Sequence, residues 1–274
     1  MKLRTIAILS GILIAGALSA QTMTDVINEF NAGVEKVNNQ EYDASIEHFN
    51  QVLSMAASVG DSATEMKASA QKLIPASNYK QAMMFLKRKQ YDNAIPYLEK
   101  TIESAALYNN NQESSAKASK YLLQSYMREG QRAYKNDAYD ESLGFYDKAL
   151  EMNENLYQAH LGKGMAFRDM DEIDAMLDEF AVAKEGAMAK NDTKTIETIN
   201  KAVDGYFNTL IKEEFEAIDP EEPEYEYVFE ACEKAHSANP ENARAYYYMA
   251  SIYNKQSEYE QAIDAALKGI SSET

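Results

Sequence analysis

The side chains that could do chemistry in this sequence are few and scattered. Three histidines, one cysteine and one acidic run are the candidates: His48, His160, His236, Cys232 and residues 169–174. A hydrolase needs a nucleophile, a base and an orienting group that converge, and the sequence contains no HExxH, GxSxG or glycine-rich phosphate motif. We therefore predict that the protein has no catalytic site and no cofactor.

Each candidate also has a structural interpretation. The acidic run 169–174 lacks the central glycine and the terminal glutamate of a calcium loop, and aspartate is a good helix cap, so we predict a turn and no metal site. A single cysteine excludes an internal disulfide, and we predict that Cys232 is a small buried apolar side chain. Asp61-Ser62-Ala63 resembles an O-glycosylation acceptor of some Gram-negative envelope proteins, but a helix N-cap explains Asp61 or Ser62 equally well.

Charge and the first twenty residues restrict the class of partner. The 274 residues include 27 basic and 44 acidic side chains, so the formal net charge is −17. Residues 1–20 have a basic start, an apolar run and a small-residue exit, the order of a secretory signal peptide. We expect cleavage near Ala20, a net charge of −19 in the mature chain, a periplasmic location and no membrane insertion after cleavage. Such a charge argues against a nucleic-acid partner, because phosphate neutralisation needs a basic surface.

A repeated pattern organises almost the whole mature chain. Six segments place a small residue about three positions after an aromatic or isoleucine, and a large apolar residue four positions further on. They begin at Tyr42, Tyr91, Tyr139, Ile173, Tyr225 and Tyr259. Upstream of most of them lies a second helical stretch with a small residue where two helices would cross, at Gly33, Ala82, Gly130, Gly164 and Ala250. The pattern predicts helical hairpins that stack to bury their apolar faces.

The last copy of the pattern resembles the tetratricopeptide repeat, a 34-residue helix–turn–helix unit. It carries Tyr246, Met249, Ala250, Tyr253, Tyr259, Ala262, Ala266 and Gly269 in the family's order. The resemblance implies an all-α fold of about six repeats in a right-handed superhelix, over residues 21–274. The units would lie near 26–60, 62–108, 112–154, 157–190, 192–240 and 243–274, with hairpin turns near residues 40, 90, 137, 171, 221 and 257.

Three repeat spacings are longer than 34 residues. They are 49, 48 and 52 residues, and the extra 14 to 18 residues are helix-forming. Either each extra stretch lengthens the first helix of the next unit, or it forms a separate short helix. Pro75 should kink or divide the helix expected over about 62–89.

The charges are unevenly distributed along the chain. Residues 65–135 have a net charge of +6, whereas residues 192–242 have a net charge of −10. In the tetratricopeptide family the first helices line a concave groove, which the resemblance places at twelve positions here. They are Tyr79, Lys80, Met83, Lys87, Met127, Arg128, Gln131, Tyr134, Lys135, Leu161, Met165 and Arg168. Methionine, tyrosine and basic side chains suit an extended peptide with apolar and acidic groups.

We therefore expect a non-catalytic periplasmic scaffold that binds a segment of a partner protein in this groove. Two alternatives remain open at this stage. One is an accessory subunit of an outer-membrane assembly, secretion or cell-wall machine, and the other is a self-assembling structural protein. The second is motivated by the C-terminal repeat, whose face at Ile263, Ala266, Leu267 and Ile270 should be only partly covered and would allow a homo-oligomer.

Overall fold

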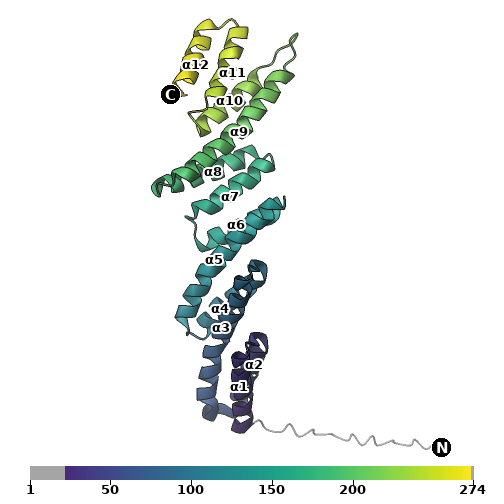
Figure 1. The fold of residues 1–274 in the computed structure, drawn as a ribbon, viewed down its shortest axis with the longest axis vertical. Helices are drawn as coiled ribbons and strands as arrows, with labels where there is room; N and C mark the ends of the chain where they lie inside the picture. The colour runs from purple at the N-terminus through teal and green to yellow at the C-terminus, as the bar shows by residue number, and fades with distance from the viewer. Residues whose placement is uncertain (1–21, 273–274) are drawn as a thin grey trace, which may run out of the picture. The chain divides into compact units, whose positions relative to one another are not determined.

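The computed structural model describes residues 22–272, and these form a purely helical fold without a β-strand (Figure 1). Twelve α-helices and one short 3-10 helix follow one another within this range. They are α1 (Met23–Asn38), α2 (Tyr42–Val59), η1 (Gly60–Ala63), α3 (Thr64–Lys87), α4 (Tyr91–Leu107), α5 (Gln112–Lys135), α6 (Tyr139–Met152), α7 (Tyr157–Asp169), α8 (Ile173–Ala189), α9 (Thr193–Ala217), α10 (Glu226–Ala238), α11 (Ala243–Lys255) and α12 (Tyr259–Ser272). The predicted all-α class of stacked helical repeats is confirmed.

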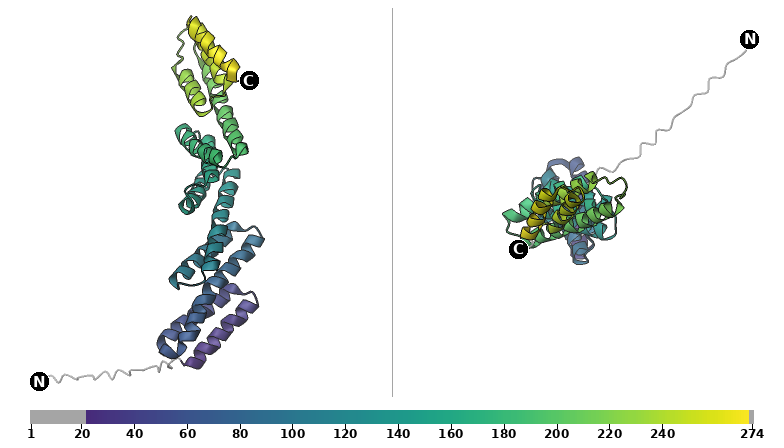
Figure 2. Two further views of the ribbon diagram at one scale, coloured as in Figure 1. Left: turned by 90° about the vertical axis from the view of Figure 1, so that its left-hand side faces the viewer. Right: turned by 90° about the horizontal axis from the view of Figure 1, so that it is seen from above.

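Consecutive helices pair as hairpins, as in α1 with α2, α3 with α4, α7 with α8 and α11 with α12, and within each compact unit neighbouring hairpins pack on one another (Figure 2). In five hairpins the chain reverses after a residue with positive φ, a conformation that ends a helix and redirects the backbone. These residues are Gln40, Lys89, Asp137, Asp171 and Ser257. The turns lie where the sequence pattern predicts them, except that the one between α9 and α10 is a longer segment around Pro220 and Pro223.

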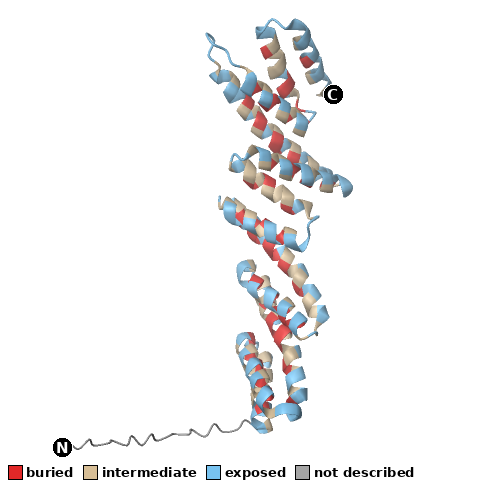
Figure 3. Cartoon of the chain, turned by 180° about the vertical axis from the view of Figure 1, so that it is seen from behind, coloured by how far each residue is buried: buried red, intermediate tan, exposed pale blue. Residues whose placement is uncertain are grey.

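The contacts divide the chain into two compact units, with the boundary between Leu122 and Leu123 inside α5. The core of the first unit comes from α1, α2, η1 and α3, and includes Val26, Phe49, Val52 and Ile74. The core of the second unit runs from α8 to α11 and includes Phe180, Phe207, Ile211, Val228 and Ile252. Buried residues follow one side of each helix, as Figure 3 shows. The handedness of the superhelix and a single domain over 21–274 stay predictions.

Within a hairpin, a small residue of the first helix faces a large side chain of the second helix sixteen positions later. A Cβ added at Gly33 would lie 2.7 Å from the Phe49 ring, and one at Gly164 would lie 2.5 Å from the Phe180 ring. Gly130 faces Tyr146 in the same way. The rings occupy the space that a side chain on the first helix would need, so the backbones of the two helices can approach closely.

Apart from residues 62–63, which belong to the short η1, the extra residues lengthen first helices and form no separate helices. α3 and α5 each have 24 residues and α9 has 25, whereas α7 and α11 have 13. Of the two alternatives for Pro75, division of the helix is wrong, because α3 runs continuously through this residue. A kink at Pro75, which is buried, stays a prediction.

The N-cap interpretation of Asp61 or Ser62 is also wrong. Both residues lie inside η1, and the N-cap of α3 is Ala63, which makes no side-chain cap. No helix within residues 22–272 is long and apolar enough to cross a membrane. The apolar run near the N-terminus, with the predicted cleavage position, lies outside the described residues.

We predict that Gly164→Ala lowers the free energy of unfolding by roughly 1–3 kcal/mol, because the added Cβ overpacks the Phe180 ring. Gly144→Ala is the matched control, since a Cβ there meets nothing within 4 Å. The control should raise stability by about 0.5–1 kcal/mol, because alanine is the better helix former. Urea unfolding followed by circular dichroism measures both changes. Equal stability of the two variants would show that this crossing does not need a glycine.

Candidate functional site

The twelve predicted groove residues all lie on the first helices of three successive hairpins, and we call them the first-helix surface. α3 contributes Tyr79, Lys80, Met83 and Lys87, which belong to the first compact unit. α5 and α7 contribute the others from the second unit: Met127, Arg128, Gln131, Tyr134, Lys135, Leu161, Met165 and Arg168. The two parts are described separately below.

The part on α3 combines exposed ammonium groups with half-buried apolar side chains. Lys80 and Lys87 are exposed, while Tyr79 and Met83 are half-buried. The Lys80 ammonium lies 5.8 Å from the centre of the Tyr42 ring, a cation–π distance that leaves the charge accessible to solvent. Burial raises the pKa of Tyr79, so its hydroxyl stays protonated and can donate a hydrogen bond.

In the second unit, Tyr134 and Arg168 come together with Asp169. The Tyr134 hydroxyl donates to Asp169 Oδ2 at 2.6 Å, and Arg168 Nη2 donates to the Tyr134 oxygen at 3.2 Å. Arg168 Nε also lies 2.7 Å from Asp169 Oδ1, so the guanidinium charge is balanced by the neighbouring carboxylate. Burial and the acceptor Asp169 raise the pKa of Tyr134 to about 12. Arg168 therefore contributes less free charge to the surface than the sequence implies.

The bond between Tyr134 and Asp169 belongs to a set that links residues 35 positions apart. Tyr157 donates to Asp192 Oδ2 at 3.0 Å, Tyr206 donates to Asp171, and Asn239 Nδ2 donates to Asp204 at 2.9 Å. A 34-residue repeat brings such positions together where one helical hairpin meets the next. Sequence reasoning missed these links, although the 35-residue spacing of tyrosine or asparagine from aspartate is a readable signal.

Two of the cavities beside α9 in the second unit have volumes of about 400 and 670 Å³. One, of about 400 Å³, opens between α7 and α9 and is lined by Arg168, Asp171, Lys201, Tyr206 and Leu210 among others, so it adjoins the first-helix surface. The other, of about 670 Å³, lies between α8, α9 and α10. Its walls include Leu177, Phe180, Met188, Ile199 and Val203, and its rim is charge-balanced by Asp178, Glu185, Lys184 and Lys234. The sequence did not predict the second cavity.

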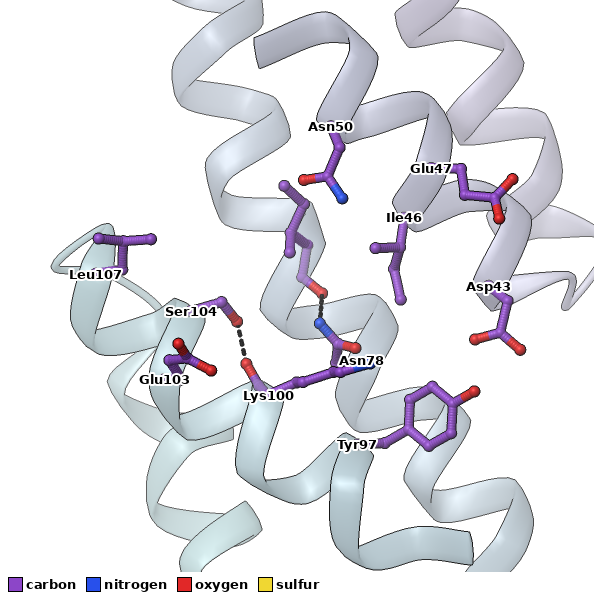
Figure 4. Close-up of a pocket in the computed structure, with 11 residues that line it drawn as sticks. Asp43, Ile46, Glu47, Asn50, Asn78, Tyr97, Lys100, Glu103, Ser104 and Leu107 are labelled. Carbon is purple, nitrogen blue, oxygen red and sulfur yellow. Dashed lines mark hydrogen bonds between the residues drawn. The ribbon is translucent and has the colours of Figure 1, made fainter. Parts of the chain in front are cut away.

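The first unit has a more polar cavity of about 430 Å³ between α2, α3 and α4 (Figure 4). Asp43, Glu47 and Glu103 supply carboxylates there, and Lys100 supplies the opposite charge. Asp43 is engaged with Gln81 Nε2 at 3.2 Å. Burial and the acceptor Asp43 raise the pKa of Tyr97, whose ring lies at one end of the cavity in Figure 4.

The candidate chemical groups are engaged with neighbouring helices. His48 pairs with Glu29 and His160 with Glu179, each at 2.6 Å, and His236 contacts the Tyr246 hydroxyl. Cys232 is fully buried, as predicted, and burial raises its thiol pKa to about 12. Residues 22–272 contain no group of histidine, cysteine and acidic side chains arranged for a metal ion.

Comparisons with known proteins give one family match, near the C-terminus, and several matches to solved structures. The family model described as tetratricopeptide repeat matches residues 228–272, from α10 to the end of α12. This segment resembles a tetratricopeptide repeat. Comparison with curated protein sequences gives no match.

Several solved helical-repeat structures are similar over most of the chain. MamA residues 41 to the end from Desulfovibrio magneticus RS-1 is 17% identical, with 73% of this chain and 95% of that chain covered and a TM-score of 0.32. YrrB, described as a TPR protein with an unusual peptide-binding site, is 17% identical over 81% and 90%, with a TM-score of 0.29. The TPR2AB domain of yeast Sti1 in complex with pHSP90 is 16% identical over 91% of both chains, with a TM-score of 0.28.

We predict that Tyr134→Phe lowers the free energy of unfolding by about 1 kcal/mol at pH 7, because one hydrogen bond to Asp169 is lost. The raised pKa of Tyr134 means that the protonated hydroxyl stabilises the fold below pH 10, and that this contribution is lost as pH rises toward about 12. The difference between wild type and variant should therefore shrink between pH 10 and 12 in denaturant titrations. Tyr227→Phe, which alters an exposed tyrosine of α10, is the control. A difference that stays constant with pH would contradict the role of the hydroxyl.

Proposed function

We propose that this protein is a non-catalytic scaffold that binds an extended segment of a partner protein along the first-helix surface. One observation carries the proposal: the first helices α3 and α5 present exposed basic side chains beside half-buried methionines, and α7 adds a further half-buried methionine. Lys80, Lys87, Arg128 and Lys135 are exposed, and Met83, Met127 and Met165 are half-buried. Flexible methionine side chains adapt to different apolar groups, and within each unit stacked hairpins hold that unit's part of the surface in place.

The charge of this surface indicates an acidic partner. The Arg128 guanidinium donates to the neutral Gln131 amide at 3.3 Å, and Lys80 lies over an aromatic ring, so these cations keep their charge. Arg168 is balanced by Asp169, which places the basic centre of the surface on α3 and α5. In a mature chain of formal charge −19, such a local excess of positive charge would steer an acidic segment toward these helices and raise its association rate.

The proposed compartment is the periplasm of a Gram-negative cell, reached after cleavage near Ala20. The order of residue types in 1–20 supports export, and the start of α1 is compatible with it. Thr22 and Asp25 form a capping box, in which Asp25 Oδ2 accepts from the Thr22 backbone at 2.8 Å and Thr22 Oγ1 accepts from the Asp25 backbone at 3.3 Å. Removal of residues 1–20 would therefore leave the cap of the first helix intact.

We predict that the purified native protein has the mass of a chain beginning at or near Gln21 and is recovered from the periplasmic fraction. Intact-mass spectrometry of the protein expressed with its own N-terminus measures this. Expression with residues 1–20 deleted is the control, and it should give the same folded protein in the cytoplasm. A native mass that includes residues 1–20, with the protein in the membrane pellet, would contradict the proposed export.

Charge reversal tests the proposed surface directly. A partner captured from the periplasmic fraction should bind the triple variant Lys80→Glu, Lys87→Glu and Arg128→Glu at least tenfold more weakly than wild type. The fold should persist, because exposed charges rarely contribute more than about 1 kcal/mol each. The control Lys190→Glu, Lys194→Glu and Lys212→Glu makes the same change in net charge at exposed positions of the α8–α9 region.

Calorimetric titration of both variants decides between the outcomes. Retained affinity in the control and loss in the triple variant support the surface, and wild-type binding should weaken toward ~1 M salt, where the screening length is ~3 Å. Equal losses in both variants would show that net charge alone matters. Unchanged affinity in the triple variant would place the partner elsewhere.

A further inference from the structure

The last helix, α12, has an apolar face that the described residues leave uncovered. Tyr259, Ile263, Leu267 and Ile270 are 61–64% exposed. Their spacing of i, i+4, i+8 and i+11 places them on one side of the helix. Ala266 lies between Ile263 and Ile270 on that side. Its small side chain leaves room at the centre of the face for another helix to approach closely. In Figure 3 most of α12 is drawn as exposed.

The exposed face of α12 is more apolar than the corresponding face of the five preceding second helices. In the repeat register, Ile263 corresponds to Ile46, Ile95, Leu143, Leu177 and Phe229, which are buried or half-buried. Leu267 corresponds to Asn50, Glu99, Asp147, Ala181 and Glu233, which are all exposed. The last repeat therefore carries a leucine at a position where the five earlier repeats have a polar residue or alanine. This substitution widens the apolar face of α12.

We propose that this face pairs two copies of the protein, tail to tail, about a two-fold axis. A two-fold interface needs only one patch, which meets itself on the partner. The other large apolar side chains exposed in α1 to α11 are scattered. Ile27, Leu107, Met152, Tyr227 and Tyr247 lie singly on α1, α4, α6, α10 and α11, and Val182 and Met188 share α8 but are six positions apart, on different sides of the helix. Among the described residues, α12 is thus the one helix whose exposed apolar groups form a continuous stripe.

The first described helix, α1, does not match α12 as a partner. The exposed residues of α1 are mostly polar, with Asn28, Asn31 and Glu35 among them, and the single large apolar one, Ile27, is only 39% exposed. Stacking of α12 on α1 of another copy would therefore bury apolar groups against polar ones. A closed pair of C-terminal repeats is favoured over an open head-to-tail fibre.

The size and charge of the face indicate how two copies would meet. Each of the four side chains exposes on the order of 100 Å² to solvent. Together they would form the apolar centre of the interface, and the polar residues around them would bring the buried area closer to the roughly 800 Å² per partner of a standard interface. Glu260 and Asp264 flank the stripe on one side. Glu260 lies near the N-terminal end of the stripe, so an antiparallel pair keeps it away from its own copy, whereas a parallel pair would place the two carboxylates side by side. Asp264, nearer the centre, is paired with Lys268 at 2.7 Å.

The test uses the full mature chain in sedimentation equilibrium over protein concentration. Wild type should reach twice the chain mass at micromolar concentrations, and higher salt should strengthen the pair, because two strongly acidic copies repel each other. Leu267→Asp should remain folded by circular dichroism and weaken dimerisation at least tenfold. Met188→Asp, at another exposed apolar position in α8, is the matched control and should dimerise as wild type does.

Cysteine cross-linking distinguishes the two-fold arrangement from other pairings. Ala266→Cys lies near the expected axis and should form a disulfide with its own copy, whereas Gln261→Cys, outside the stripe, should not. The native Cys232 is buried and does not compete. A monomer at all concentrations, a species that grows beyond the dimer, a dimer indifferent to Leu267→Asp, or α12 occupied by a different protein would each overturn the proposal. These outcomes are independent of partner binding on the first-helix surface.

Discussion

Close crossing of two helices within each hairpin is the constraint on which the rest of this structure depends. Gly33, Gly130 and Gly164 leave room for an aromatic ring from the second helix, and Ala82 and Leu98, which have the same spacing of sixteen positions, are both fully buried. A hairpin held this closely still buries only one face by itself, so its remaining apolar groups need the next hairpin. The core is therefore a series of junctions, and surfaces along the first helices keep a fixed spacing within each unit.

Two of the cavities in this structure lie beside lengthened first helices. The cavity of about 430 Å³ in the first unit and the apolar cavity of about 670 Å³ in the second both adjoin a long first helix, α3 or α9. α4 has 17 residues and α10 has 13, so each is shorter than the helix it pairs with. The longer helix leaves part of its length without a partner in its own hairpin, and cavities open beside it. These cavities differ in chemistry, because carboxylates line the first and aliphatic groups line the second.

Much of the fold could be predicted from the sequence, because each hairpin is local and repeats with a recognisable spacing. The turn residues, the small residues at the crossings and the buried Cys232 follow from that spacing. Continuous helix through Pro75 could not be predicted, since it depends on packing against neighbouring helices. Asp61 and Ser62 lie inside a single 3-10 turn, and the amino-acid composition does not specify the backbone geometry of one turn.

The candidate site was harder to predict than the fold. The positions of the first-helix surface follow from the repeat, but their free charge does not, because Asp169 binds both Arg168 and Tyr134. The cavity between α8, α9 and α10 needs three helices from two hairpins, and no linear pattern marks it. The exposed face of α12 was foreseen from Ile263 and Ile270, and the unusual nature of Leu267 becomes clear only when all six repeats are aligned.

Hydrogen–deuterium exchange of the mature protein, alone and with its captured partner, tests the central claim most directly. The account predicts slower exchange on binding in α3 from Tyr79 to Lys87 and in the second half of α5, with little change in α8 and α10. Protection confined to α8, α9 and α10 would place the partner in the apolar cavity and contradict binding on the first-helix surface.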